Sequence, residues 1–279
     1  MKFKNTKAYN FEGAFHGMRN PMNSWGRSDS FFGITNIYNT DILTDICEDW
    51  IQEENIGRIE RGEEPYSHDM TYYQEYYDKL EKYEDWFTKN GILDCNEHGE
   101  IYSVALIGPN DMSLAQKLIL AGPEHCKFMR QIFVNVDITA PLYWWKEFDT
   151  YKVGTVANST STMHKLATTP ITIDCFEGDD YQGIYAIPDR EDEKIICPTQ
   201  IIEYCEYLRQ KYLETKDKGY WKELIRWLPE SWLQTRTVTM SYANLRNMYM
   251  QRQNHKLLEW HAFCAWVDTL PYSAKLITI

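Results

Sequence analysis

The sequence predicts an α+β fold in which a mixed or antiparallel sheet packs against long helices. Two observations lead to this prediction. Several long stretches carry apolar residues at helical spacing, and a few short stretches are β-branched and partly alternate with polar residues. Hydrophobic residues make up 43% of the 279 residues and charged residues 25%, which is a globular composition. Because no linker divides the chain, we expect a single domain over residues 1–279.

The N-terminal region begins without a clear periodic pattern. Residues 1–35 carry several glycines and an Asn-Pro pair, so we expect loops and turns there. Apolar residues at helical spacing, such as Ile42 and Trp50, then predict a helix over 40–56. A charged stretch over 53–64 is expected to end this helix.

Two further helices and a short strand are expected before residue 123. A segment rich in Tyr and charged residues predicts a helix over 70–90, for which Gly91 is a suitable C-cap. Residues 100–106 are expected to form a short strand. The next helix is expected over 113–120, where Gly122-Pro123 stops it.

The middle of the chain alternates between regular and polar segments. Residues 127–139 are β-branched and partly alternating, which predicts a strand. A helix is expected over 141–150, because Pro141 suits a first helical turn. Residues 154–169 form a polar stretch, and the acidic residues 178–193 are expected to form a surface excursion.

Helices dominate the expected C-terminal region. Residues 199–215 place Ile202, Cys205 and Leu208 on one side and predict an amphipathic helix. A short helix follows over 220–227. The last long helix is expected over 239–268, on the basis of its apolar contacts.

Charge and composition exclude several classes of function. The 29 Lys and Arg residues against 41 Asp and Glu residues give a net charge of −12, which argues against a partner that is a nucleic-acid polymer. No apolar run approaches a membrane span, and the basic N-terminus lacks the apolar stretch of a secretory signal. The seven cysteines include no C-x-x-C pair, so we expect reduced thiols in a cytoplasmic protein. No histidine pair has metal-ligand spacing, so no metal is expected.

Two stretches stand out by their pattern, although no phosphate-binding loop, dinucleotide fingerprint or nucleophile elbow is present. The first runs from Gly122 to Phe128 and continues at Ala140–Phe148 into the polar stretch. The second begins at Arg226 and reaches Glu259.

In their order and spacing, the two stretches resemble the flavin-dependent thymidylate synthases. That family has E-H-x-x-F before a strand, A-P before a helix with an Arg-Gln pair, and the signature R-H-R-x-x-S-x-N-E-x-S-x-R. Near its C-terminus it has Leu-Pro and a helix with Asn and L-R-x-x-x-H-A-Q-x-E. The matching residues here are Glu124–Phe128, Ala140-Pro141, Lys146-Glu147, Leu228-Pro229, Asn247, Arg252, His255 and Glu259.

The signature itself is degraded. Laid without a gap, R-H-R falls on Thr150-Tyr151-Lys152, and the later Glu, Ser and Arg fall on Asn158, Thr160 and Thr162. A shift by one residue restores Asn158 and Ser161 but leaves the arginines absent. Each lost arginine contact to phosphate costs about 1.5–3 kcal/mol, so ordinary nucleotide binding requires other residues to compensate.

The resemblance implies a fold, a chemistry and a set of site residues. The fold would be that of the family, with residues 1–110 as a divergent N-terminal portion. The family uses FAD, reduced by NADPH, to pass a methylene group from methylenetetrahydrofolate to dUMP, in a homotetramer. By position, the implied flavin contacts are His125, Lys152, Asn158 and Asn247. The implied contacts to a pyrimidine nucleotide are Glu147, Thr160, Ser161, Arg226 and Arg252.

Each of these residues also has an ordinary structural interpretation, as a solvated helix residue, a loop residue or a polar residue at a helix interface. Glu147 replaces the family's Gln, and an ionised carboxylate only accepts hydrogen bonds. It would therefore reject a phosphate or a carbonyl and favour an amino group.

Three hypotheses remain. The first is a divergent enzyme that binds FAD and a pyrimidine nucleotide. The second is a non-catalytic relative that kept the fold and acts as a binding or interaction protein. The third is an unrelated α+β domain.

Overall fold

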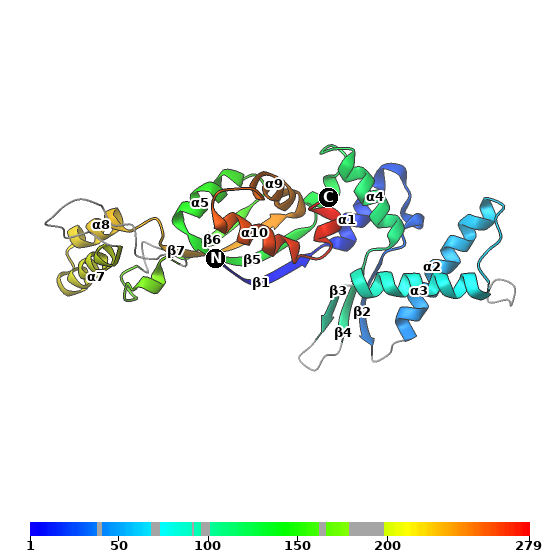
Figure 1. Cartoon of the computed structure of the whole chain (residues 1–279), viewed down its shortest axis with the longest axis horizontal. Coiled ribbons are helices and arrows are strands. Elements are labelled where there is room, and N and C mark those ends of the chain that lie inside the picture. The colour runs from blue at the N-terminus through cyan, green and yellow to red at the C-terminus, as the bar shows by residue number, and fades with distance from the viewer. Residues whose placement is uncertain (38–40, 68–72, 91, 96–100, 162–165, 179–197) are drawn as a thin grey trace. The chain divides into compact units, whose positions relative to one another are not determined.

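The computed structural model describes the secondary structure of residues 1–37, 41–67, 73–90, 92–95, 101–161, 166–178 and 198–279 (Figure 1). The chain divides into two compact units. Unit 1 joins Met1–Ala8 to Phe133–Val267, and unit 2 joins Tyr9–Ile132 to Asp268–Ile279. The expectation of a single domain stays a prediction.

Unit 1 is built on a four-stranded sheet with the order β1-β5-β7-β6. Its strands are β1 (Lys2–Tyr9), β5 (Phe133–Pro141), β6 (Val156–Ser159) and β7 (Leu233–Ser241). β5 and β7 pair antiparallel over their whole length, and β6 adds an antiparallel edge to β7.

Strict alternation along β5 gives this sheet one apolar and one polar face. Val134, Val136 and Ile138 are fully buried, whereas the residues between them are half-buried. The half-buried residues pair with threonines of β7; for example, the Thr237 hydroxyl donates to Asp137 at 2.5 Å. Polar cross-strand pairs of this kind stabilise the sheet and set its register.

Both central strands run directly into helices. β5 continues into α5 (Leu142–Phe148) and β7 into α9 (Tyr242–Arg252), followed by α10 (Leu258–Asp268) (Figure 1). Because β5 and β7 are antiparallel, α5 and α9 start at opposite ends of the sheet. Nine strand residues span about 30 Å, and these two helices together cover about 27 Å. Their C-terminal ends are therefore expected to come together if both helices fold back along the sheet.

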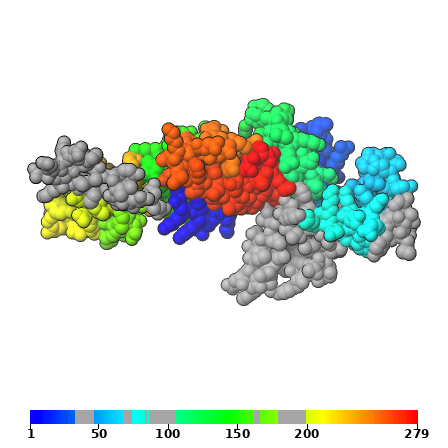
Figure 2. All heavy atoms as spheres, in the orientation of Figure 1, coloured from blue at the N-terminus to red at the C-terminus, as the bar shows by residue number. Residues whose placement is uncertain are grey.

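Aromatic rings fill the space around α5 and α10. Trp144, Trp145 and Trp260 have no exposed surface. The N-terminal strand closes one side of this core, because the Phe3 ring stacks on Trp266 with 4.9 Å between centroids. In Figure 2 the blue atoms of this strand lie directly beneath the orange atoms of the C-terminal helices.

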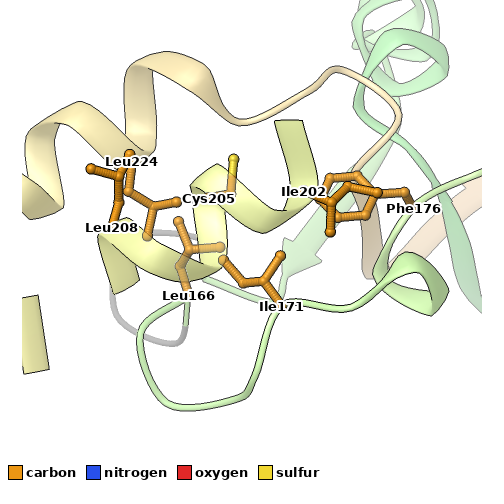
Figure 3. Packing of buried hydrophobic residues seen from close by; sticks show 7 residues of the cluster. All are labelled: Leu166, Ile171, Phe176, Ile202, Cys205, Leu208 and Leu224. Carbon is orange, nitrogen blue, oxygen red and sulfur yellow. The ribbon is translucent and has the colours of Figure 1, made fainter. Parts of the chain in front are cut away.

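A helical module lies between β6 and β7 in the sequence. We define it as the described residues 166–178 and 198–227, with α7 (Pro198–Thr215) and α8 (Lys218–Trp227). It has its own apolar core (Figure 3). The buried residues of that core are Leu166, Ile171, Phe176, Ile202, Cys205, Leu208 and Leu224.

Unit 2 combines helices with a three-stranded antiparallel sheet in the order β2-β4-β3. Its strands are β2 (Phe31–Ile37), β3 (Ile92–Cys95) and β4 (Ile101–Leu106). Its helices are α1 (Phe11–Met18), α2 (Asp41–Glu60), α3 (Tyr73–Asn90), α4 (Pro109–Leu120) and α11 (Ser273–Leu276).

A buried polar network supports the start of α4 in unit 2. Asp111 is fully buried and accepts from Arg19 Nε at 2.5 Å and from the hydroxyls of Ser28 and Ser30. Asp29 accepts from the backbone N–H groups of Asn110 and Asp111, at 2.8 and 3.0 Å. These bonds satisfy donors that a helix N-terminus leaves open.

The fold class predicted from the sequence is confirmed, and most of the predicted helices are present. The helix expected over 40–56 runs on to Glu60, through part of the charged stretch, and the helix expected over 113–120 begins at Pro109. The strand expected over 127–139 starts only at Phe133, because Lys127–Arg130 forms a 3-10 turn. Apart from Gly178, the acidic segment 178–193 lies outside the described residues.

Two predictions about the ends of the chain are wrong. The expected loops of residues 1–35 contain β1, α1 and the start of β2. The glycines of α1 favour turns when read locally, yet its Phe11 and Phe15 are buried together with Ala14 and Met18.

The last long helix is the second error. It was expected from residue 239, but Thr239 lies in β7, and the helix is interrupted between Arg252 and Leu258. Ser241 starts α9 with a capping box to Asn244, which marks the true helix start.

Among the described residues, no helix combines the length and the apolar character that crossing a bilayer requires. The same residues include no group of three or more His, Cys, Asp or Glu side chains placed to hold a metal ion.

Candidate functional site

Glu147 and Arg252, which the sequence places in two separate segments, lie side by side in unit 1. Glu147 is in the last turn of α5, and Arg252 is the last residue of α9. Arg252 Nη1 donates to Glu147 Oε2 at 2.9 Å, and the two side chains are 19% and 33% exposed. The pair is therefore partly shielded from water but still open to a ligand.

Three neighbours hold this pair in place. Trp260 Nε1 donates to the same Glu147 oxygen at 2.9 Å, and His255 Nε2 lies 3.4 Å from it. Arg252 Nε donates to the Tyr151 hydroxyl at 2.7 Å. The Arg252 guanidinium also lies 4.8 Å from the centroid of the Trp260 ring, a cation–π contact.

These contacts leave two atoms of the pair without a hydrogen-bond partner in the part of the chain that the structure describes. They are Nη2 of Arg252, a donor, and Oε1 of Glu147, an acceptor. A ligand that offers an acceptor beside a donor can bind both atoms at once.

Packed aromatic rings lie next to the pair of Glu147 and Arg252. Trp260 packs on Trp144 at 4.9 Å and on Phe263 at 5.4 Å between ring centroids. Tightly packed rings hold their rotamers, so the Glu147 carboxylate is oriented before any ligand arrives.

A second acidic contact lies one helical turn away on α5. The Tyr143 hydroxyl donates to Glu259, and Glu177 Oε2 lies 3.3 Å from the same hydroxyl. Burial, and then the Glu259 carboxylate, raise the pKa of Tyr143 above its ordinary value, so its proton is retained. Because residues four apart share a helix face, α5 presents Glu147 close to this carboxylate-rich contact. Such surroundings favour N–H groups and disfavour a phosphate.

The expected flavin contacts do not form a cluster through the hydrogen bonds of the described residues. Lys152 is exposed just after the 3-10 turn Asp149–Tyr151, and Asn158 is exposed on β6, opposite Thr237. Asn247 is exposed on α9, where its side-chain oxygen accepts from Gln251 at 2.8 Å. His125 is exposed in unit 2, and its backbone N–H donates to Gly122.

The remaining expected substrate contacts lie on the β6 edge and in the helical module. The Thr160 N–H donates to the Thr235 carbonyl at 2.9 Å and prolongs the β6 edge, with Ser161 next in the chain. Arg226 is exposed on α8 and pairs with Glu223 at 3.0 Å. In the part of the chain that the structure describes, a hydrogen bond and an ion pair join Glu147 directly to Arg252.

A flavin dinucleotide carries a diphosphate, which needs cations or convergent N–H donors. Of the four residues expected to contact it, Lys152 supplies a cation on an exposed side chain, and the side-chain oxygen of Asn247 accepts from Gln251 within its own helix. The residues present therefore do not form a cradle that fits the diphosphate.

Sequence reasoning missed Tyr151 and Trp260 as supports of the site. Tyr151 stands within the segment aligned with the degraded R-H-R, and Trp260 directly follows Glu259 in the C-terminal block. Their positions beside matched residues were the available signal, but an aromatic residue in a helical pattern usually indicates core packing.

No known family model matches this chain, and no curated protein matches it by sequence. Solved structures do match it. Two structures of the flavin-dependent thymidylate synthase ThyX from Helicobacter pylori with FAD and dUMP are 18% identical, with a TM-score of 0.44. They cover 61% of this chain, which covers 83% and 82% of theirs. The UMP/dUMP methylase PolB from Streptomyces cacaoi, bound with 5-Br dUMP, is 14% identical, with a TM-score of 0.44 and coverages of 61% and 81%.

Proposed function

We propose that this chain is a divergent relative of the flavin-dependent thymidylate synthases and that unit 1 binds a pyrimidine nucleotide through Glu147 and Arg252. One observation carries the proposal. Two residues that the sequence resemblance selected from separate segments meet in a 2.9 Å ion pair. Each also keeps one polar atom available to a ligand.

The available atoms complement the edge of a pyrimidine base. Uracil offers a carbonyl beside N3–H, and cytosine offers N3 beside its amino group. In either case the acceptor would bind Arg252 Nη2 and the donor would bind Glu147 Oε1. A base methylated at N3 lacks the required donor or acceptor and should be rejected.

We place the nucleotide phosphate away from the carboxylates of Glu147, Glu177 and Glu259, because like charges repel. Lys152 is the cation that the degraded signature retains, and we propose that it contacts the phosphate together with Asn158, Thr160 and Ser161 of the β6 edge. Arg226 is proposed as a further contact, on condition that it leaves its exposed pair with Glu223. Exposed pairs of this kind contribute about 0–1 kcal/mol, so that exchange costs little.

Methyl transfer to dUMP with FAD, NADPH and methylenetetrahydrofolate is the activity that the resemblance implies, in a cytoplasmic homotetramer. We assign no catalytic step to the residues of this chain, because the flavin contacts do not form a diphosphate cradle. The same observation favours the second candidate function, a non-catalytic relative that binds a nucleotide or a partner protein.

Titration calorimetry with dUMP, dCMP and N3-methyl-dUMP tests the nucleotide proposal. We expect dUMP or dCMP to bind and N3-methyl-dUMP to bind at least tenfold more weakly, since one charge-assisted hydrogen bond is worth about 1.5–3 kcal/mol. Arg252→Ala should abolish measurable binding while the free energy of unfolding changes by about 1 kcal/mol. Arg61→Ala, which removes an exposed arginine of unit 2 paired with Glu63, is the matched control.

Equal binding of all three nucleotides, or binding that survives Arg252→Ala, contradicts the assignment of the base to this pair. The flavin question has a separate readout. After incubation with FAD and removal of the excess, a retained yellow absorbance supports the enzyme, and a colourless protein that still binds nucleotide supports the non-catalytic relative. Sedimentation of the same sample tests the tetramer.

A further inference from the structure

The helical module carries a groove of about 400 Å³ that lies apart from Glu147 and Arg252 in the sequence and shares no lining residue with them. Its apolar lining comes from Ile171, Ile173 and Ile202. Ile171 and Ile202 also belong to the module core shown in Figure 3. Ile173 is 50% exposed and leaves an apolar surface open to solvent beside the groove.

Aromatic rings lie along one rim of the groove. Tyr207 lines it, and Tyr204 stacks on Tyr207 with ring planes 16° apart. Tyr204 is 42% exposed and Tyr207 is 49% exposed. They lie three residues apart on α7 and therefore form one ridge on the outer face of that helix.

The charge of the groove is negative. Glu206 lines it, and its hydrogen bonds from Arg209 hold the pKa of Glu206 at about 2, so it stays ionised. Arg209 neutralises that carboxylate. Glu203 also lines the groove and is exposed, and among the described residues it has no ion-pair partner. One uncompensated carboxylate therefore faces the groove next to an aromatic ring.

We propose that this groove binds an extended segment of a partner protein through an arginine or lysine side chain. The aliphatic stem of such a residue packs on the three isoleucines, while its charged end contacts Glu203 and the Tyr207 ring. The net charge of −12 on the chain adds long-range attraction for a basic partner. This inference is independent of the proposed nucleotide site.

Fluorescence anisotropy on the full chain tests the proposal with two labelled peptides. One alternates leucine and arginine, and in the other each arginine is replaced by citrulline, a neutral side chain of nearly the same shape. We expect the arginine peptide to bind about tenfold more tightly. Glu203→Gln should weaken it about threefold, and Tyr207→Ala about fivefold.

Glu214→Gln is the matched control, because it removes the same charge from the exposed face of α7 outside the groove lining. It should leave the affinity within a factor of about 1.5. Equal affinity for the two peptides overturns the proposal, and so does an equal loss in the Glu203 and Glu214 variants, which would indicate general charge attraction. Methyl NMR of Ile171, Ile173 and Ile202 gives a second readout. Changes in their chemical shifts when the peptide binds support the groove as its site. Unchanged chemical shifts at all three residues would show that the peptide binds elsewhere and would overturn the proposal.

Discussion

The indole N–H of Trp260 donates to Glu147 Oε2 at 2.9 Å, so a ring without exposed surface orients a carboxylate that is 33% exposed. This contact links the aromatic core of unit 1 to the candidate site. It also means that core stability and ligand binding share one hydrogen bond.

Trp260→Phe keeps most of the ring but removes this donor. We expect a loss of about 1–2 kcal/mol in the free energy of unfolding, because the acceptor is charged and partly buried. Urea denaturation measures it. Trp227→Phe removes an indole N–H bonded to Glu223 from a side chain that is 56% exposed, and it should cost almost nothing. A loss in Trp260→Phe no larger than that in Trp227→Phe would contradict a stabilising bond from Trp260 to Glu147.

Tyr143→Phe removes the proton that Glu259 accepts. The Glu259 carboxylate then faces Glu177 without a donor between them, and we expect a destabilisation of about 1–3 kcal/mol. Thermal unfolding followed by circular dichroism measures the loss. Tyr204→Phe, on the exposed face of α7, is the control and should leave the melting temperature unchanged. An unchanged melting temperature in Tyr143→Phe contradicts the contact.

Asp29 makes the stability of unit 2 depend on pH. Burial is the main cause that raises its pKa from 3.8 to about 6, against the lowering effect of the Asn110 and Asp111 N–H groups. A pKa that is higher in the folded protein favours the folded state below pH 4, and this contribution is lost as the pH rises through 6. The loss is about 3 kcal/mol for a shift of this size.

Asp29→Asn removes this titration. Urea denaturation between pH 4 and 7 should therefore show a smaller fall in stability for the variant than for the parent chain. If the free energy of unfolding falls equally with pH in the variant and in the parent chain, a group other than Asp29 is responsible.

Gly108 precedes α4 where the backbone approaches Asp29 most closely. A Cβ at this position would overlap the backbone oxygen and the carboxyl group of Asp29. Gly108→Ala should therefore destabilise the chain by more than about 2 kcal/mol, since backbone atoms cannot move aside cheaply. Gly26→Ala meets nothing within 4 Å and should change stability by less than about 0.5 kcal/mol. Similar values for the two variants would contradict the close approach at Gly108.

Sequence patterns predicted the helices whose apolar residues face one neighbour, such as α7, where Ile202, Cys205 and Leu208 are all buried. They failed for β1, because most of its side chains are exposed and only Phe3 and Ala8 are partly buried. They failed again at Thr239, where a strand and a helix follow each other without a turn. The short alternation of Val238 and Met240 was hidden by the helical pattern after it.

The candidate site was predictable only in part for a similar reason. Glu147 and Arg252 were found because the resemblance selected each of them separately. Their pairing could not be read from the sequence, because it depends on α5 and α9 starting at opposite ends of the sheet. That arrangement follows from the antiparallel register of β5 and β7, a long-range contact.

The direct junctions from β5 to α5 and from β7 to α9 also determine where residues can be inserted into this chain or exchanged. One residue inserted into α5 or α9 would turn the following side chains by about 100° around the helix axis, and Glu147 would lose Arg252. The long connection from β6 to β7 carries no such constraint on either junction. Segments of the helical module could be exchanged there while Glu147 and Arg252 stay in register, provided that Glu177, which lies against Tyr143, and Arg226 are kept. The β5–α5 and β7–α9 junctions are thus fixed in length, whereas the connection from β6 to β7 can vary.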